Sequence, residues 1–406
     1  MLQMNELGKR IHKLRLEKGM TLVDLAGNQM TKGMLSMIEN GRANPSMESL
    51  KFIARQLNCD PHYLLENHTS DELKYLFNQV EEAFHKNNDE QITNLTQGLF
   101  DQQLPTSFES ARILEIGGRT VVKNDQEQGE MLIERAVAIY EQLSLFSHCV
   151  AAKVHVVENR AKKGNYGDAL RLLRSIQKKY HEKAAVIDTV VEVEANYVEV
   201  VLLFGVGDYK SGKIKLNHLI ELSKRKRVFY KMDDIFRIAA FQSLIHNNEN
   251  DYAYFIKKSE QFAVFSENDG SLAFTLLLQA HYHNQTSKDY EQVLFYLNEF
   301  ATLLKGEIGS DYYYLEKGKA LLGIGQVEEA LVELNQFEMP TTISYPLELS
   351  ILYTADAYKA ICLLQLGRVE EASSYAARAA RNIGPLPRTP YQEFINNTLD
   401  MVNKSL

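Results

Sequence analysis

Proline is absent from a long central stretch of this sequence. Of the eight prolines in 406 residues, none falls between Thr106 and Met339, a span of 234 residues. Apolar residues in that span recur mostly at three- and four-residue spacing, which is the period of an amphipathic helix. Alternating patterns and Asn-Gly or Asp-Gly hairpin signals, which would indicate strands, are nearly absent. Because proline breaks helix interiors and is missing here, we expect an all-α protein.

The central stretch is built from a repeated unit. Six segments share a turn residue, a polar residue, then Tyr or Val, and then a helical pattern. These segments begin at Gly164, Gly207, Asn250, Lys288, Gly325 and Gly367. Their spacing of 37 to 43 residues fits two antiparallel helices and a turn, as in looser relatives of the tetratricopeptide (TPR) repeat. With weaker units near Asn88 and Asn124 and a capping helix from Thr389 to Lys404, we expect seven or eight helix pairs in residues 73–406. We expect these pairs to stack into a right-handed superhelix with a concave inner surface.

Charge and cysteine use narrow the class of protein. The chain has 45 Lys and Arg against 53 Asp and Glu, a net charge of −8. Residues 1–66 carry +2 and the remainder −10, so a slightly basic head precedes an acidic body, with a polar linker at 67–72. The three cysteines have no paired spacing, which excludes a disulfide framework or a cysteine zinc site and favours a reducing compartment. No segment has the roughly 20 apolar residues that cross a bilayer or the apolar core of a signal peptide. We therefore expect a cytoplasmic protein without membrane contact.

The head is predicted to be a bundle of five short helices. Thr21, Thr31 and Ser46 each precede a helical pattern and predict an N-cap. Asn40-Gly41 predicts the turn after the third helix, and Asp60-Pro61 predicts the start of the fifth. Five helices in about 60 residues indicate a compact module.

Three segments of the head resemble the Cro/cI-type helix-turn-helix domain. They are LGKRIHKLRLEKGMTLVDLA, TKGMLSMIENGRANPSMESL and FIARQLNCDPHYLL, within residues 5–65. The resemblance implies that the helix from Thr31 to Glu39 lies in the major groove of double-stranded DNA, reading bases from its outer face, while the following turn contacts phosphates. The implied base-reading residues are Thr31, Lys32, Gly33, Met34, Ser36 and Met37, and the implied phosphate contacts are Asn40, Arg42 and Asn44. The alternative is a helical bundle for protein contacts, which the polar and positive outer face disfavours.

Two features depart from that family. The turn between the second and third helices lacks the usual glycine and instead reads Gly27-Asn-Gln-Met30. Base recognition is also chemically sparse, because Gly33 and Met37 offer no side-chain hydrogen bonds and Lys32 is the only long donor. We therefore expect modest direct specificity, supplemented by DNA shape and by dimerisation.

A helix-turn-helix head joined to an acidic TPR-like array resembles the Rap/Rgg/NprR/PlcR/PrgX group of peptide-sensing regulators. PlcR-like and NprR-like proteins are the most similar in size and order of parts. The resemblance implies a quorum-sensing transcriptional regulator, acting as a homodimer or higher oligomer, that holds a short signalling peptide along the concave groove, largely through Asn side chains. The alternative, as in Rap-like relatives, is a docking array that sequesters a response regulator or other protein, with the head serving autoregulation.

Helical periodicity gives an independent indication of where the groove lies. Counted back from each repeat's turn residue, positions −3, −10 and −14 are mostly apolar and are expected to face the core. Positions −4, −8 and −11 share another face, because they are three and four residues apart, and are polar in successive repeats. From that face we select Lys153, Arg160, Asn196, Gln242 and Asn284 as peptide contacts. The resemblance alone adds Asn159.

No combination of residues predicts catalysis, a metal or a cofactor. Gly207 to Lys213 matches the GxxxxGK pattern, but Ile214 stands where a nucleotide-binding loop needs Ser or Thr. His281 and His283 are two residues apart and so lie on different helix faces. With no nucleophile and base pair or carboxylate pair to be found, we expect a protein that is not an enzyme.

Overall fold

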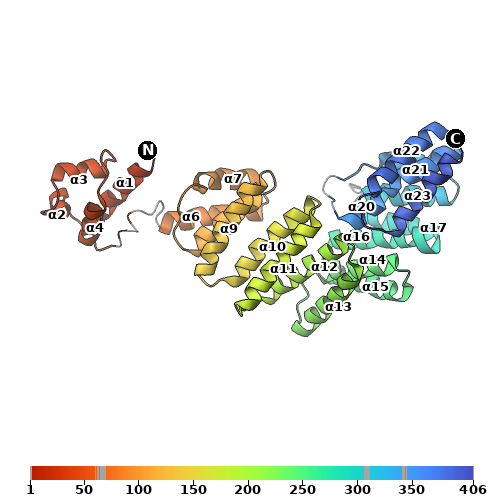
Figure 1. Ribbon diagram of the computed structural model, residues 1–406, viewed down its shortest axis with the longest axis horizontal. Coiled ribbons are helices and arrows are strands. Elements are labelled where there is room, and N and C mark those ends of the chain that lie inside the picture. The colour runs from red at the N-terminus through yellow and green to blue at the C-terminus, as the bar shows by residue number, and fades with distance from the viewer. Residues whose placement is uncertain are drawn as a thin grey trace. The chain divides into compact units, whose positions relative to one another are not determined.

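The computed structural model describes residues 2–59, 61, 64, 70–305, 311–340, 343 and 345–405. Every regular element in these ranges is a helix, so the all-α prediction is confirmed (Figure 1). The chain divides into two compact units, Met1–Val156 and Val157–Leu406. A helix-turn-helix bundle at the N-terminus is followed by helical repeats, as expected. None of the described helices is both long and apolar enough to cross a membrane.

The N-terminal bundle contains α1 (Leu2–Glu17), α2 (Leu22–Ala26), α3 (Lys32–Glu39) and α4 (Met47–Gln56). The expected N-caps are present, since Thr21, Thr31 and Ser46 each accept a hydrogen bond from the backbone three residues on. The core of the bundle is fully buried and contains Ile11, Leu25, Leu35, Ile38, Leu50 and Ile53. The fifth helix predicted at Asp60-Pro61 falls mostly outside the described residues. The first half of the predicted linker, 67–69, also lies outside them, and its second half, 70–72, already belongs to α6, which begins at Ser70.

In the first unit, the helices that follow the head pack as successive pairs. They are α6 (Ser70–His85) with α7 (Asp89–Thr96), and α8 (Phe108–Val121) with α9 (Gln126–Gln142). A short 3-10 turn, η1 (Gln97–Leu99), follows α7. The boundary between the two units falls inside α10 (Phe146–Lys162).

The second unit begins with the end of α10 and α11 (Tyr166–Glu182) and continues as helix pairs. These are α12 (Thr189–Gly205) with α13 (Tyr209–Lys226), α14 (Met232–Ile245) with α15 (Glu249–Phe265), α16 (Asp269–Tyr282) with α17 (Tyr290–Leu303), α18 (Asp311–Gly323) with α19 (Val327–Gln336), and α21 (Thr354–Gln365) with α22 (Val369–Ile383). We call the earlier member of each pair its first helix. The first helices α14, α16, α18 and α21 pack against one another in succession, and α23 (Pro390–Asn403) packs on the last pair.

Glycine-led turns begin four of the six predicted repeats. Gly164, Gly207, Gly325 and Gly367 all have φ between 77° and 84°, a left-handed conformation that glycine adopts without steric strain. The turn predicted at Asn250 is wrong. Asn247 is the left-handed residue there, with φ 55°, and Asn250 lies inside α15. The turn therefore lies three residues before its predicted position, a shift of nearly one helical turn.

An element that the repeat pattern does not predict interrupts the array before α21. A short helix, α20 (Pro346–Leu352), packs against α12. Its Leu347 is fully buried in a core cluster with residues of α12, α13 and α14, including Phe204, Leu219 and Phe236. The chain therefore returns from the C-terminal repeats to the first repeats of the second unit.

Candidate functional sites

The recognition-helix candidate, α3, exposes Lys32, Gly33 and Met37 on its outer side. Leu35 and Ile38 are buried on its inner side. The predicted DNA-facing residues lie on the outer side or in the turn that follows. Thr31, Lys32, Gly33, Met37, Asn40, Arg42 and Asn44 are exposed, whereas Met34 and Ser36 are half-buried. The structure thus brings the nine together along one helix and its C-terminal turn.

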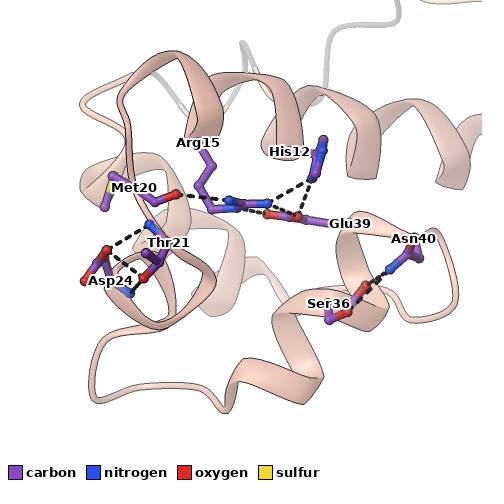
Figure 2. Close-up of polar contacts among 8 residues, drawn as sticks. All are labelled: His12, Arg15, Met20, Thr21, Asp24, Ser36, Glu39 and Asn40. Carbon is purple, nitrogen blue, oxygen red and sulfur yellow. Dashed lines mark hydrogen bonds and ion pairs between the residues drawn. The ribbon is translucent and has the colours of Figure 1, made fainter.

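Asn40 has a structural role that the sequence interpretation missed. Its side-chain Nδ2 donates to the Ser36 backbone oxygen at 2.7 Å, which adds a second hydrogen bond to a carbonyl that also accepts from the Asn40 backbone N–H. The backbone N–H of Arg42 donates to the Met37 oxygen at 2.7 Å, so the turn folds back on the helix. Figure 2 shows the Asn40 amide pointing at Ser36. The amide of Asn40 therefore closes the helix, and Arg42 remains the exposed cation of the turn.

A buried ion pair joins α1 to the end of α3. Arg15 Nε donates to Glu39 Oε1 at 2.7 Å and Nη2 donates to Glu39 Oε2 at 2.9 Å, so the guanidinium and the carboxylate meet through two parallel bonds (Figure 2). His12 Nδ1 lies 2.7 Å from Glu39 Oε2, and Arg15 Nη1 donates to the Met20 oxygen at 3.0 Å. Arg15 is 6% exposed and Glu39 is 7% exposed. These contacts fix the orientation of α3 on α1.

The electrostatics of this pair favour the charged forms. Burial pushes the pKa of Glu39 upward, but hydrogen bonds from Arg15 and His12 outweigh burial and hold that pKa below its usual value. The hydrogen bond to Glu39 raises the pKa of Arg15. Close backbone packing accompanies the pair, since a Cβ added to Gly8 of α1 would lie 2.4 Å from the Ile38 oxygen. Arg15 and Glu39 have no distinguishing pattern in the sequence, because they are 24 residues apart.

The six predicted peptide contacts divide between the units. Lys153 belongs to the first unit, and its Nζ bonds Glu134 of α9 at 2.7 Å and 3.0 Å. Asn159 and Arg160, near the end of α10, are half-buried and belong to the second unit. The remaining three are 5% to 8% exposed: Asn196 lies in the middle of α12, Gln242 near the end of α14, and Asn284 in the turn that follows α16. The six predicted contacts thus come from both units, one from the first and five from the second.

Several of these buried side chains have polar atoms without a hydrogen-bond partner. Both side-chain polar atoms of Gln242 are buried and unpaired. The side-chain oxygens of Asn159 and Asn284 are also buried and unpaired. Asn196, in contrast, donates to the Glu192 oxygen of its own helix at 2.6 Å. Unpaired buried polar atoms are rare in folded proteins and are expected where a ligand completes the hydrogen bonding.

Asn284 belongs to a buried polar network, which begins in the π-helical turn η2 (His283–Ser287). Its Nδ2 donates to both the backbone oxygen and the carboxylate of Glu316 at 2.8 Å. The same carboxylate binds His281 Nδ1 at 2.8 Å and Lys319 Nζ at 2.7 Å. Burial would raise the pKa of Glu316, but Lys319 and His281 lower it to about 2. This network joins α16 to α18, and the hydroxyl of Tyr391, 2.7 Å from His281 Nε2, extends it to α23.

A small cavity of about 100 Å³ lies among α14, α16, α18 and α20. Its apolar lining includes Ile238, Phe241 and Leu278, and its polar lining is Arg237, His281, Tyr312, Tyr345 and Glu348. The sequence interpretation missed this cavity because it did not predict α20. The only local signal was Tyr345-Pro346, where proline takes the first position of the helix.

Comparison with known proteins agrees with the geometry of the head. A family model described as helix-turn-helix matches residues 11–64. Residues 11–64 form a helix-turn-helix domain. This domain is similar to the HTH-type transcriptional regulator DdrOP3 of Deinococcus deserti, with 42% identity over 62 residues, which are 15% of this chain. The aligned part spans 48% of that regulator, so the chain covers about half the length of its curated relative.

Three solved structures are similar to larger parts of this chain than the helix-turn-helix domain alone. PlcR of Bacillus thuringiensis, solved with the peptide PapR7 and DNA, is 19% identical, covering 65% of this chain and 96% of that chain with a TM-score of 0.39. ComR of Streptococcus vestibularis is 16% identical, covering 68% and 98% with a TM-score of 0.37. A tetratricopeptide repeat protein of Parabacteroides merdae is 12% identical, covering 73% and 99% with a TM-score of 0.48.

Proposed function

We propose that this protein is a cytoplasmic transcriptional regulator that binds operator DNA through α3 and is switched by a short signalling peptide bound along the first helices of its repeat domain. In this proposal the head is residues 1–66, the linker 67–72 and the repeat domain 73–406. The peptide signal makes the protein a quorum-sensing receptor. No enzymatic step is part of the mechanism.

The observation that carries the peptide proposal is the set of buried, unpaired polar atoms. Gln242 contributes two such atoms, and Asn159 and Asn284 one each. Leaving a buried polar group without a partner costs about 1–3 kcal/mol. An extended peptide offers an N–H and a C=O at every residue and so supplies the missing partners. Peptide binding would then offset part of this cost.

The DNA proposal rests on the helix-turn-helix domain and its exposed polar helix. Heads of this kind read two half-sites about one helical turn apart, near 34 Å, so we propose that the protein binds as a homodimer. A peptide that favours one arrangement of the two repeat domains then changes the spacing of the heads and hence operator affinity. A hundredfold switch requires about 2.7 kcal/mol of differential peptide affinity. Activation and repression are both compatible with this coupling.

The test measures peptide and operator binding by the purified full-length protein. Selection from random duplexes defines the operator, and synthetic peptides from short reading frames beside the gene serve as the candidate signals. We expect one peptide to bind by calorimetry and Gln242→Leu to weaken it at least tenfold, with Lys178→Leu on the exposed side of α11 as the control. A peptide that binds equally well to the Gln242 variant would contradict the proposed location.

A second candidate function, docking of a protein partner, has one observation in its favour. Aromatic side chains are exposed between α13 and α14 and at the end of α15, with Phe229 at 53%, Tyr230 at 44% and Phe265 at 75%. Exposed aromatic groups are common in protein interfaces. Under this alternative, substituting Lys32 and Arg42 abolishes DNA binding and leaves sequestration of a response regulator or other partner intact. Loss of regulation with those substitutions supports the operator mechanism.

A further inference from the structure

The cavity among α14, α16, α18 and α20 contains a carboxylate without a partner. Glu348 of α20 lines the cavity and makes no hydrogen bond or ion pair within the described part of the chain. The hydroxyl of Tyr345, on the same rim, is buried and also unpaired. Glu348 is half-buried, and burial raises the pKa of its carboxyl while Arg237 lowers it in part.

Arg237 is the cation nearest to this carboxylate in the cavity lining, and its hydrogen bonds go elsewhere. One guanidinium nitrogen bonds Asp234 on the same helix, and Nη1 donates to Ser271 Oγ at 2.9 Å. The guanidinium also lies over the Phe274 ring, 5.4 Å from its centre. The hydrogen bonds of Arg237 therefore go to Asp234 and Ser271 and not to Glu348.

The rest of the cavity wall is suited to a hydrocarbon stem. Ile238, Phe241 and Leu278 supply apolar surface, and the volume of about 100 Å³ is of the order of one side chain. The cavity therefore combines apolar walls with an acidic group and an unpaired hydroxyl. An aliphatic stem that ends in an ammonium group satisfies all three, because such groups bury the stem and pair the charged head.

We propose that this cavity is a specificity pocket for a primary ammonium group on an apolar stem, which donates to Glu348 and to the Tyr345 hydroxyl. The proposal rests on the proposed function, since it assigns the chemistry of one position of the peptide. The ammonium has two possible sources, a lysine side chain or the N-terminal amine of a peptide whose first residue is apolar. A peptide carboxylate directed at Arg237 is the competing arrangement, and the occupied hydrogen bonds of that guanidinium disfavour it.

The experiment compares four small probes on the full-length protein by ligand-detected NMR and calorimetry. Nα-acetyl-lysinamide carries a side-chain ammonium, and leucinamide carries a terminal ammonium. Nα-acetyl-norleucinamide is the uncharged counterpart of the first, and Nα-acetyl-norleucine is an anion. We expect one ammonium probe to bind at least tenfold more tightly than the uncharged and anionic probes, and which one does so identifies the source.

Two variants locate the effect. Glu348→Gln keeps the shape of the pocket and should remove the preference for the ammonium probe, and Tyr345→Phe should weaken that probe by a smaller factor. Glu299→Gln, on the exposed side of α17, is the matched control and should bind like the native protein. Equal or tighter binding of the anion, no binding of any probe at millimolar concentration, or a preference that survives Glu348→Gln would overturn the proposal. Each of those results leaves the peptide-binding test at Gln242 unaffected, so the two failures are distinguishable.

Discussion

Replacing Glu39 by Gln tests whether the buried pair with Arg15 holds the recognition helix in place. Arg15 is only 6% exposed and meets Glu39 through bonds of 2.7 Å and 2.9 Å. Removing one partner of a buried ion pair costs about 3–5 kcal/mol. Glutamine keeps one acceptor for Arg15, so we expect a loss of about 2–3 kcal/mol, which is roughly a 30- to 150-fold increase in local opening.

Amide hydrogen exchange of the full-length protein measures that opening directly. Exchange in α1 and α3 should accelerate by this factor in the Glu39 variant, while the repeat helices exchange at the native rate. Glu17→Gln, an exposed change on α1, is the control and should stay within about threefold of the native rate. The lowered pKa of Glu39 means that its stabilisation is present above the ordinary carboxyl pKa and is lost as pH falls through the lowered value. Native exchange rates in α3 of the Glu39 variant would refute the structural role of the pair.

Three further changes have defined outcomes. Gly8→Ala places a Cβ 2.4 Å from the Ile38 oxygen and should destabilise the head by about 2 kcal/mol. The measurement is the denaturation midpoint of the head, which should fall. An unchanged midpoint would contradict the close packing of α1 on α3. Glu316, with its pKa lowered to about 2, should stabilise the second unit above pH 4.5 and lose this contribution as pH falls toward 2. Thermal unfolding of Glu316→Gln should therefore be less sensitive to acid than that of the native protein, and identical pH profiles would contradict the assignment. Arg42→Ala should weaken operator binding for all sequences alike and reduce the salt slope by about one, whereas a change confined to one base position would indicate base reading instead.

The helices of the head were predictable because their signals are local. Thr21, Thr31 and Ser46 lie within a few residues of the helices that they cap, and the hydrogen bonds that they accept are of the kind expected from that spacing. The departure noted in the turn at Gly27 has a simple explanation. Gly27 itself, with φ 52°, ends α2, so the turn does contain a glycine in a left-handed conformation, at its first residue.

Long-range features of the site were not predictable in the same way. The pairing of Arg15 with Glu39 depends on how α1 packs on α3, and in sequence both residues have the pattern of ordinary surface charges. The turn at Asn247 was misplaced because Asn250, followed by Asp and Tyr, matches the repeat pattern although it lies inside α15. The partner of Asn284 is Glu316, 32 residues away, which no periodicity indicates.

The repeat period predicted the helix pairs but not what interrupts them. Offsets counted from a turn assume that every repeat is alike, and α20 breaks that assumption between α19 and α21. Glu348 and Tyr345 therefore escaped the sequence argument, although they line the cavity. The misplaced turn shifts the counted position of Gln242 by three residues, which is close to one helical turn, so its assignment to the polar face stays a prediction.

The most direct test of this account is the operator affinity of the full-length protein measured with and without the peptide encoded beside its gene. We expect the bound peptide to change operator affinity at least tenfold, in either direction, and Gln242→Leu to abolish that change while leaving the peptide-free affinity as in the native protein. A peptide that binds at the repeat domain and leaves operator affinity unchanged would contradict the coupling of the two parts.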